Sequence, residues 1–139
     1  MSKRRLGYLL KHANLRLADL TGPALEPYGI DGREFAVLSV LGAPEPLSQL
    51  EAAQRLGIDR TTMVALVDAL ERKGLVGRRP HPGDRRKNMV EPTGRGRETL
   101  AEATRAVDAA EAAFLAVLPD KDARLLKDVL ERLVRAPAG

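Results

Sequence analysis

Polar and basic residues stand close together in the middle of the sequence, between positions 59 and 97. Arg60, Thr61 and Thr62 are three consecutive polar residues at the expected start of a helix. A threonine hydroxyl can hydrogen-bond a base edge or a phosphate, its methyl group can contact thymine, and an arginine can bind a phosphate or a guanine. This group of residues therefore favours a helix whose first turn reads DNA.

A second group of candidate residues lies in the loop expected at positions 80–86. Arg85 and Arg86 are suited to such a loop, because an arginine offers a charge for phosphate and a slim planar head for a narrow minor groove. Asp84 precedes Arg86 by two residues and could hold its guanidinium in a fixed pose through a bidentate bond. His81 is expected to be a turn residue rather than a ligand or a proton carrier.

The positive charge of the chain is concentrated in this part of the sequence. Residues 72–97 contain nine Lys or Arg and two acids, which gives a balance of +7, whereas the remainder has a balance of −3. A basic run alone is explained equally well as a solvated loop that confers solubility. The adjoining helical pattern shifts the interpretation toward an electrostatic surface for phosphates.

That helical pattern is typical of a helix-turn-helix. Ser48 and Glu51 have the spacing of a capping box, so they predict the start of a short helix. Gly57 supplies the turn, and Asp59 is a good N-cap for a second helix that runs to about Lys73. The pattern by itself also fits a plain helical hairpin. The residues expected to face the core are Leu50, Ala53, Leu56, Met63, Leu66, Val67 and Leu70.

Two strand-like runs follow the second helix, and they weigh against the plain helical hairpin. They are expected at Leu75–Arg79 and Lys87–Glu91, as a hairpin beside the second helix. Pro92 is expected to shorten the second strand, since a proline cannot donate to a strand ladder. A helix-turn-helix followed by a basic hairpin favours a winged DNA-binding unit.

Helices are predicted on both sides of this unit. An N-terminal leucine stripe predicts a helix that Gly22-Pro23 either ends or kinks, and Asp31 with Glu34 predicts the capped start of another. After Thr93, an expected N-cap, apolar residues recur at nearly heptad spacing, and Asp120 is expected to cap a last helix with Leu126, Leu130, Leu133 and Val134 inward. These helices fit either intramolecular packing or dimerisation. We favour a homodimer, because two-fold symmetry lengthens the DNA site that a short helix can read.

Composition excludes several other classes of protein. The chain has no cysteine, which rules out disulfides, thiol chemistry and cysteine-based zinc sites. His12 and His81 lack metal-binding spacing, and neither a nucleophile–base pair nor a phosphate-binding glycine loop is present, so we expect no metal, no cofactor and no enzyme activity. With no apolar run of membrane-spanning length and no export signal, a cytoplasmic location is expected.

The chain resembles the MarR family of winged helix-turn-helix transcriptional regulators. The resemblance is carried by DRTTMVALVDALERKGLV at 59–76, by the wing element Asp84-x-Arg86 and by Val90-x-x-Thr93-x-x-Gly96. It implies a mainly α fold with a small β-hairpin wing (α+β). Residues 31–94 would form the DNA-binding region, and residues 1–30 and 95–139 a helical dimerisation region.

The resemblance also implies a function in transcription regulation. Such a homodimer would bind a palindromic operator, often as a repressor, and release it when a small aromatic or phenolic ligand binds in a cleft lined by Tyr8, His12 and Phe35. The candidate DNA-binding residues are Ser48, Arg60, Thr61, Thr62, Val64, Ala65, Arg79, Asp84, Arg85, Arg86 and Lys87.

Two departures from the family pattern change what is expected of these residues. Val64 and Ala65 stand where many members carry a polar residue and an arginine, so base reading in mid-helix would rest on methyl contacts or be absent. The lack of cysteine excludes the oxidation-sensing branch of the family. The rival interpretation is a winged-helix protein-interaction module without specific DNA binding, which fits poorly with the +7 segment.

Overall fold

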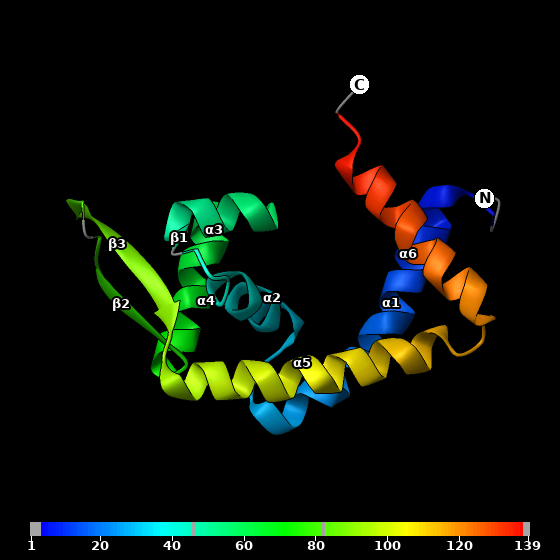
Figure 1. Cartoon of the computed structure of the whole chain (residues 1–139), viewed down its shortest axis with the longest axis horizontal. Helices are drawn as coiled ribbons and strands as arrows, with labels where there is room; N and C mark the ends of the chain where they lie inside the picture. Colours follow the sequence, from blue (N-terminus) through cyan, green and yellow to red (C-terminus); the bar gives the residue numbers. More distant parts are fainter. Residues whose placement is uncertain (1–3, 46, 82, 138–139) are drawn as a thin grey trace.

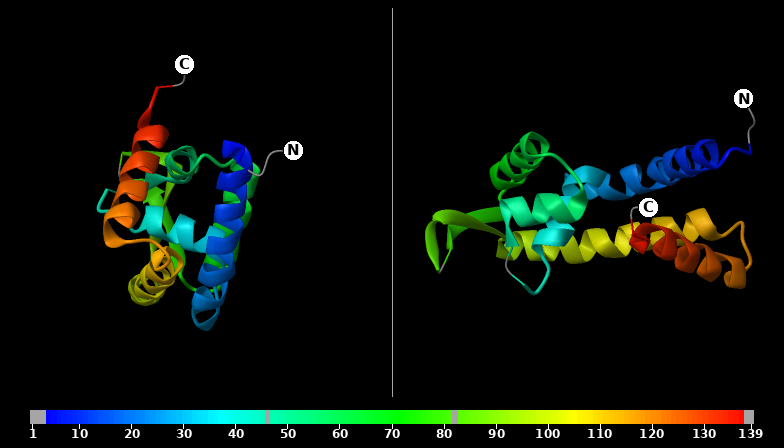
Figure 2. Two further views of the ribbon diagram at one scale, coloured as in Figure 1. Left: turned by 90° about the vertical axis from the view of Figure 1, so that its right-hand side faces the viewer. Right: turned by 90° about the horizontal axis from the view of Figure 1, so that it is seen from above.

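Two long helices join a compact winged-helix region to a separate helical end (Figure 1). The computed structural model describes residues 4–45, 47–81 and 83–137, and the side chains of residues 81 and 84–88 lie outside the description. α1 (Leu6–Leu25) and α5 (Gly94–Leu115) pack along one another, and α6 (Asp120–Arg135) follows α5. Figure 2 shows the α1–α5 pair extending away from the winged-helix region. We call α1, α5 and α6 the helical frame.

The winged-helix region is built from short helices and one small antiparallel sheet, which confirms the predicted fold class. The strand order is β1 (Leu47–Ser48), β3 (Asp84–Pro92) and β2 (Val76–His81), with Leu47 opposite Val90 and Val76 opposite Pro92. The two-residue β1 was not expected from the sequence. The elements in chain order are the 3-10 helix η1 (Glu26–Tyr28), α2 (Gly32–Leu41), β1 (Leu47–Ser48), α3 (Gln49–Leu56), α4 (Arg60–Arg72), β2 (Val76–His81) and β3 (Asp84–Pro92).

The predicted capping residues Asp31 and Ser48 begin their helices as expected. Asp31 accepts a hydrogen bond from the Glu34 N–H at 2.8 Å, and the Glu34 carboxylate accepts one from the Asp31 N–H at 3.0 Å. Ser48 and Glu51 form the same reciprocal pair at the start of α3. Each box satisfies N–H groups that have no partner within a helix, which fixes where the helix starts.

The core lies where α2, α3, α4 and the sheet meet, with α1 and α5 closing one side. Leu38, Met63, Val67 and Leu70 are fully buried there. The prediction for Leu50 is wrong, because it is 60% exposed. Ala52 and Ala53 occupy the inward face of α3 instead.

Other boundaries also differ from the sequence expectations. For α1, where the sequence left open either a stop or a kink at Gly22-Pro23, the helix continues through Pro23 to Leu25. β3 reaches Pro92, which the sheet tolerates because β1 pairs β3 only at residues 89–90 and leaves that end of β3 without a partner on its far side. Pro119 is the N-cap of α6, so Asp120 is its first helical residue rather than its cap. Within the described residues, no helix has both the length and the apolar character that crossing a membrane requires.

Candidate nucleic-acid interface

The first turn of α4 is fixed by Asp59, its N-cap. The Asp59 carboxylate accepts hydrogen bonds from the Thr62 N–H at 2.7 Å and from the Thr62 hydroxyl at 3.0 Å. The hydrogen bond from the Thr62 N–H is the main cause that lowers the pKa of Asp59, and the hydrogen bond from the Thr62 hydroxyl lowers it further. The Thr62 hydroxyl is therefore already used as a donor in the cap, and only its acceptor capacity remains for another partner.

One face of α4 is buried and the other is presented outward. Met63, Val67 and Leu70 are fully buried. The exposed residues on the opposite face include most of the predicted reading group, whereas Thr62 is half-buried. The exposed members are Arg60, Thr61, Val64 and Ala65.

Arg78 joins β2 to α4, and sequence reasoning missed it. One guanidinium nitrogen donates to Asp68 at 2.7 Å, and the other forms a close contact with Glu71. The hydrogen bond with Asp68 raises the pKa of Arg78. Asp68 and Glu71 are three residues apart, which places both carboxylates on one side of the helix. That spacing is the sequence signal that could have indicated a shared cationic partner.

Arg79 and Ser48, both predicted to contact DNA, already have partners within the fold. Arg79 lies 3.0 Å from Glu91 on the neighbouring strand, although its side chain is 58% exposed. Ser48 caps α3, and its backbone pairs with Met89. Contacts of either residue with DNA remain predictions.

The predicted wing-tip residues are only partly placed. Asp84, Arg85, Arg86 and Lys87 belong to β3 by their backbone, but their side chains lie outside the description. The predicted bond between Asp84 and Arg86 therefore also lies outside it. The backbone of β3 places these four residues toward the tip of the wing (Figure 1). Arg78 contacts α4 nearer the base of the wing.

The three residues predicted for an effector cleft are not brought together by the described contacts. Tyr8 and His12 stack on α1 with ring centroids 4.1 Å apart and an interplanar angle of 31°. His12 lines a cleft of about 690 Å³ between α1 and the α5–α6 junction, together with Phe114 and Leu126. Phe35 instead packs from α2 against the hydrophobic core.

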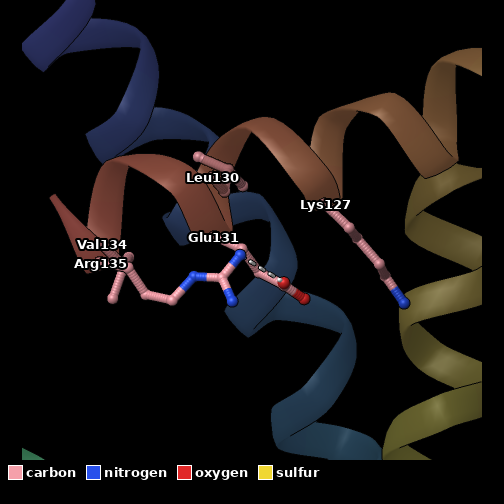
Figure 3. A pocket seen from close by; sticks show the side chains of 5 residues that line it. All are labelled: Lys127, Leu130, Glu131, Val134 and Arg135. Carbon is pink, nitrogen blue, oxygen red and sulfur yellow. Dashed lines mark hydrogen bonds and ion pairs between the residues drawn. The ribbon is translucent and has the colours of Figure 1, made fainter.

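The helical frame exposes an apolar face in the single chain. Leu6 is 63% exposed on α1, and Leu133 and Val134 are 58% and 83% exposed on α6. Figure 3 shows Leu130 and Val134 on α6 beside the Glu131–Arg135 ion pair, with Lys127 extending toward α5. These residues line a shallow depression of about 500 Å³. The predicted inward orientation of these α6 residues is therefore wrong for the isolated chain, since Leu126 and Leu130 are 36% and 37% exposed and Leu133 and Val134 are exposed still further.

Comparison with known proteins places this arrangement in a family. The model of the MarR family matches residues 28–87. An HTH-type transcriptional repressor of Mycobacterium tuberculosis is 33% identical over 128 residues, which cover 92% of this chain and 92% of that protein. The chain belongs to the MarR family. MarR family proteins are transcriptional regulators, not enzymes.

Other members of the MarR family resemble this chain over differing lengths. A putative transcriptional regulatory protein for the hcr operon of Thauera aromatica is 34% identical over 77% of this chain, and the match spans 64% of that protein. The repressor CouR bound to a 23-mer DNA duplex has a TM-score of 0.89 at 34% identity and covers 97% of this chain and 99% of its own. CouR of Rhodococcus jostii RHA1 bound to p-coumaroyl-CoA has a TM-score of 0.84 at 30% identity, over 99% of this chain and 96% of its own.

Proposed function

We propose that this MarR-family chain is a homodimeric repressor that binds a palindromic DNA operator and releases it when a small ligand binds. The observation that carries the proposal is the exposed first turn of α4, held next to an arginine-rich wing by Arg78. Residues 31–94 would bind DNA, and residues 1–30 and 95–139 would form the dimer.

Recognition would be divided between α4 and the wing. Arg60 and Thr61 are the exposed polar residues at the N-terminus of α4, the end that a recognition helix directs into the major groove. Val64 and Ala65 would contribute methyl contacts with thymine. Arg86 at the wing would enter the adjacent minor groove, with Arg85 on the backbone. The similarity to the DNA-bound repressor CouR supports this assignment.

The exposed apolar face of the helical frame supports the dimer. Large exposed apolar patches on a protein surface mark interaction sites. Here the exposed leucines and valines extend over α1 and α6, away from the winged-helix region. A second copy related by two-fold symmetry would cover them and would give the operator its palindrome.

The cleft beside His12 is the proposed ligand site. Its lining is mainly apolar, with Phe114 offering an aromatic face and Arg16 and Asp19 offering charges of opposite sign. This combination suits a small aromatic or phenolic ligand. The similarity to CouR bound to p-coumaroyl-CoA supports a ligand-responsive regulator.

Selection of bound sequences from random duplex DNA tests the proposal most directly. A palindrome with half-sites about one helical turn apart is expected. Binding should weaken steeply as salt rises, and Arg86→Ala should weaken it strongly, whereas Thr61→Ala with Thr62→Ala should relax sequence preference. Absence of salt-dependent duplex binding would overturn the proposal and leave a protein-interaction module as the function.

A further inference from the structure

Lys73, at the C-terminal end of α4, joins three parts of the fold through its ammonium. Its Nζ donates to Glu34 Oε2 at 2.7 Å and to the Gly29 carbonyl at 2.8 Å. Glu34 lies in the first turn of α2, and Gly29 ends the turn η1 that follows α1. The helix α4, the helix α2 and the turn that follows α1 therefore meet at one side chain.

The carboxylate of Glu34 is buried. Its residue is 5% exposed, and among the described residues it is the only charged one that is buried. A buried carboxylate is stable only when its oxygens are hydrogen-bonded and its charge is paired. Oε1 accepts from the Asp31 N–H, while Oε2 accepts from Lys73. Both oxygens are satisfied only while the end of α4 stays at this distance from the start of α2.

The Gly29 carbonyl adds a second restraint on the same ammonium. Gly29 adopts a positive φ of 70° and closes η1 through a hydrogen bond to the Glu26 carbonyl. Its own carbonyl therefore has a fixed direction at the junction of the frame and the winged-helix region. An ammonium between this carbonyl and Glu34 holds α4 against that junction as well as against α2.

We propose that Glu34 and Lys73 are positioning residues that fix the direction of α4 relative to the frame, and so set the separation of the two recognition helices in the dimer. The inference rests on the proposed function and deepens it. The 13 residues of α4 span about 20 Å between Lys73 and the reading residues. A tilt of about 10° at the Lys73 end would move the reading end by about 3 Å, which is close to the 3.4 Å rise of one base pair.

The preferred spacing between operator half-sites provides the test. If the contact between Lys73 and Glu34 only stabilised the fold, its loss would not change that preference. Dissociation constants are measured for the selected operator and for operators with one base pair inserted or removed between the half-sites. The variants are Lys73→Met, Glu34→Gln and the double substitution, with thermal unfolding followed in parallel. Arg72→Met is the matched control, because it removes the same charge from the neighbouring exposed position at the end of α4.

In Lys73→Met and Glu34→Gln, the preference for the selected spacing is expected to fall by roughly threefold or more. The double variant is expected to resemble the single variants, because residues that act through one contact are not additive. The control should keep the wild-type preference. An unchanged preference in both single variants, accompanied only by a lower unfolding temperature, would overturn the inference.

A measurement without DNA separates this inference from the proposed function. Because the chain has no cysteine, Thr61→Cys with Arg105→Cys gives one spin-label pair between α4 and α5. With labelled chain diluted into excess unlabelled chain, the distance distribution should be narrow and should broaden on Lys73→Met. Broadening without any selected operator would support the positioning role while contradicting the proposed function. A distribution unchanged by Lys73→Met would overturn the positioning role.

Discussion

Arg78 in β2 donates to Asp68 in α4 across 2.7 Å, which links the wing directly to the helix proposed to read DNA. The second guanidinium nitrogen contacts Glu71 one turn further along. A planar guanidinium that binds two carboxylates restrains both position and orientation. The base of the wing and α4 therefore form one unit, so their contacts with the two grooves of a duplex would be coupled.

Arg78→Met is expected to loosen the wing and to weaken operator binding. The ion pairs are partly exposed, so the expected loss of unfolding free energy is about 1 kcal/mol. Affinity should fall by more than this loss explains, because the wing would no longer be oriented. Arg72→Met is the matched control, because it removes the same charge from an exposed position in the last turn of α4, outside the candidate DNA-binding residues. Equal affinities for the two variants would contradict the coupling.

Asp59→Asn is expected to reduce stability in a pH-dependent way. Hydrogen bonds from the Thr62 N–H and hydroxyl hold the pKa of Asp59 below its ordinary value, so its ionised form is favoured in the folded state. The charge therefore contributes its full stability above about pH 4, and the contribution is lost as pH falls through the lower folded pKa. The gap in melting temperature between Asp59→Asn and wild type should be present at pH 7 and close toward pH 2. A pH-independent gap would contradict this role of the charge.

Gly96→Ala is expected to be strongly destabilising, whereas Gly94→Ala is not. A Cβ at Gly96 would lie 1.9 Å from the Leu75 carbonyl oxygen, while one at Gly94 meets nothing within 4 Å. The backbone at this junction is held by the hydrogen bond from the Thr93 N–H to the Leu75 carbonyl at 3.0 Å. Overpacking that cannot relax costs several kcal/mol, so we expect about 3 kcal/mol or more for Gly96→Ala in denaturant unfolding. Similar denaturant midpoints for Gly96→Ala and Gly94→Ala would show that the backbone at this junction can shift to accommodate the added Cβ.

Leu130→Asp is expected to produce monomers. Leu130 is 37% exposed in the single chain and belongs to the apolar face of α6. A charge in the centre of a buried dimer contact has no partner, so association should weaken by at least about tenfold. Sedimentation velocity measures the change. Leu50→Asp is the control, because Leu50 is 60% exposed in the winged-helix region and outside the frame. Unchanged association of Leu130→Asp would place the interface elsewhere.

Local sequence signals predicted the helix starts well, because a cap is decided by residues three positions apart. Asp31, Ser48, Asp59 and Thr93 all accept the hydrogen bond that their spacing predicts. The orientation of Leu50 and the end of β3 were predicted wrongly. Both depend on which neighbouring element covers a given face, and this information is not local.

The sequence by itself determined the family, the order of the helices and of the two wing strands, and the position of Arg60, Thr61 and Thr62 at the start of α4. These features follow from caps, glycine turns and hydrophobic periodicity, all of which act over a few residues. Only the tertiary structure decided that Arg78 binds Asp68 and that Lys73 binds Glu34. Lys73 and Glu34 are 39 positions apart in the sequence, and charged side chains at such a distance have many possible partners until packing of the core brings one pair within hydrogen-bond reach. The same packing leaves the leucines of α6 partly exposed, which is the feature that supports a second copy of the chain.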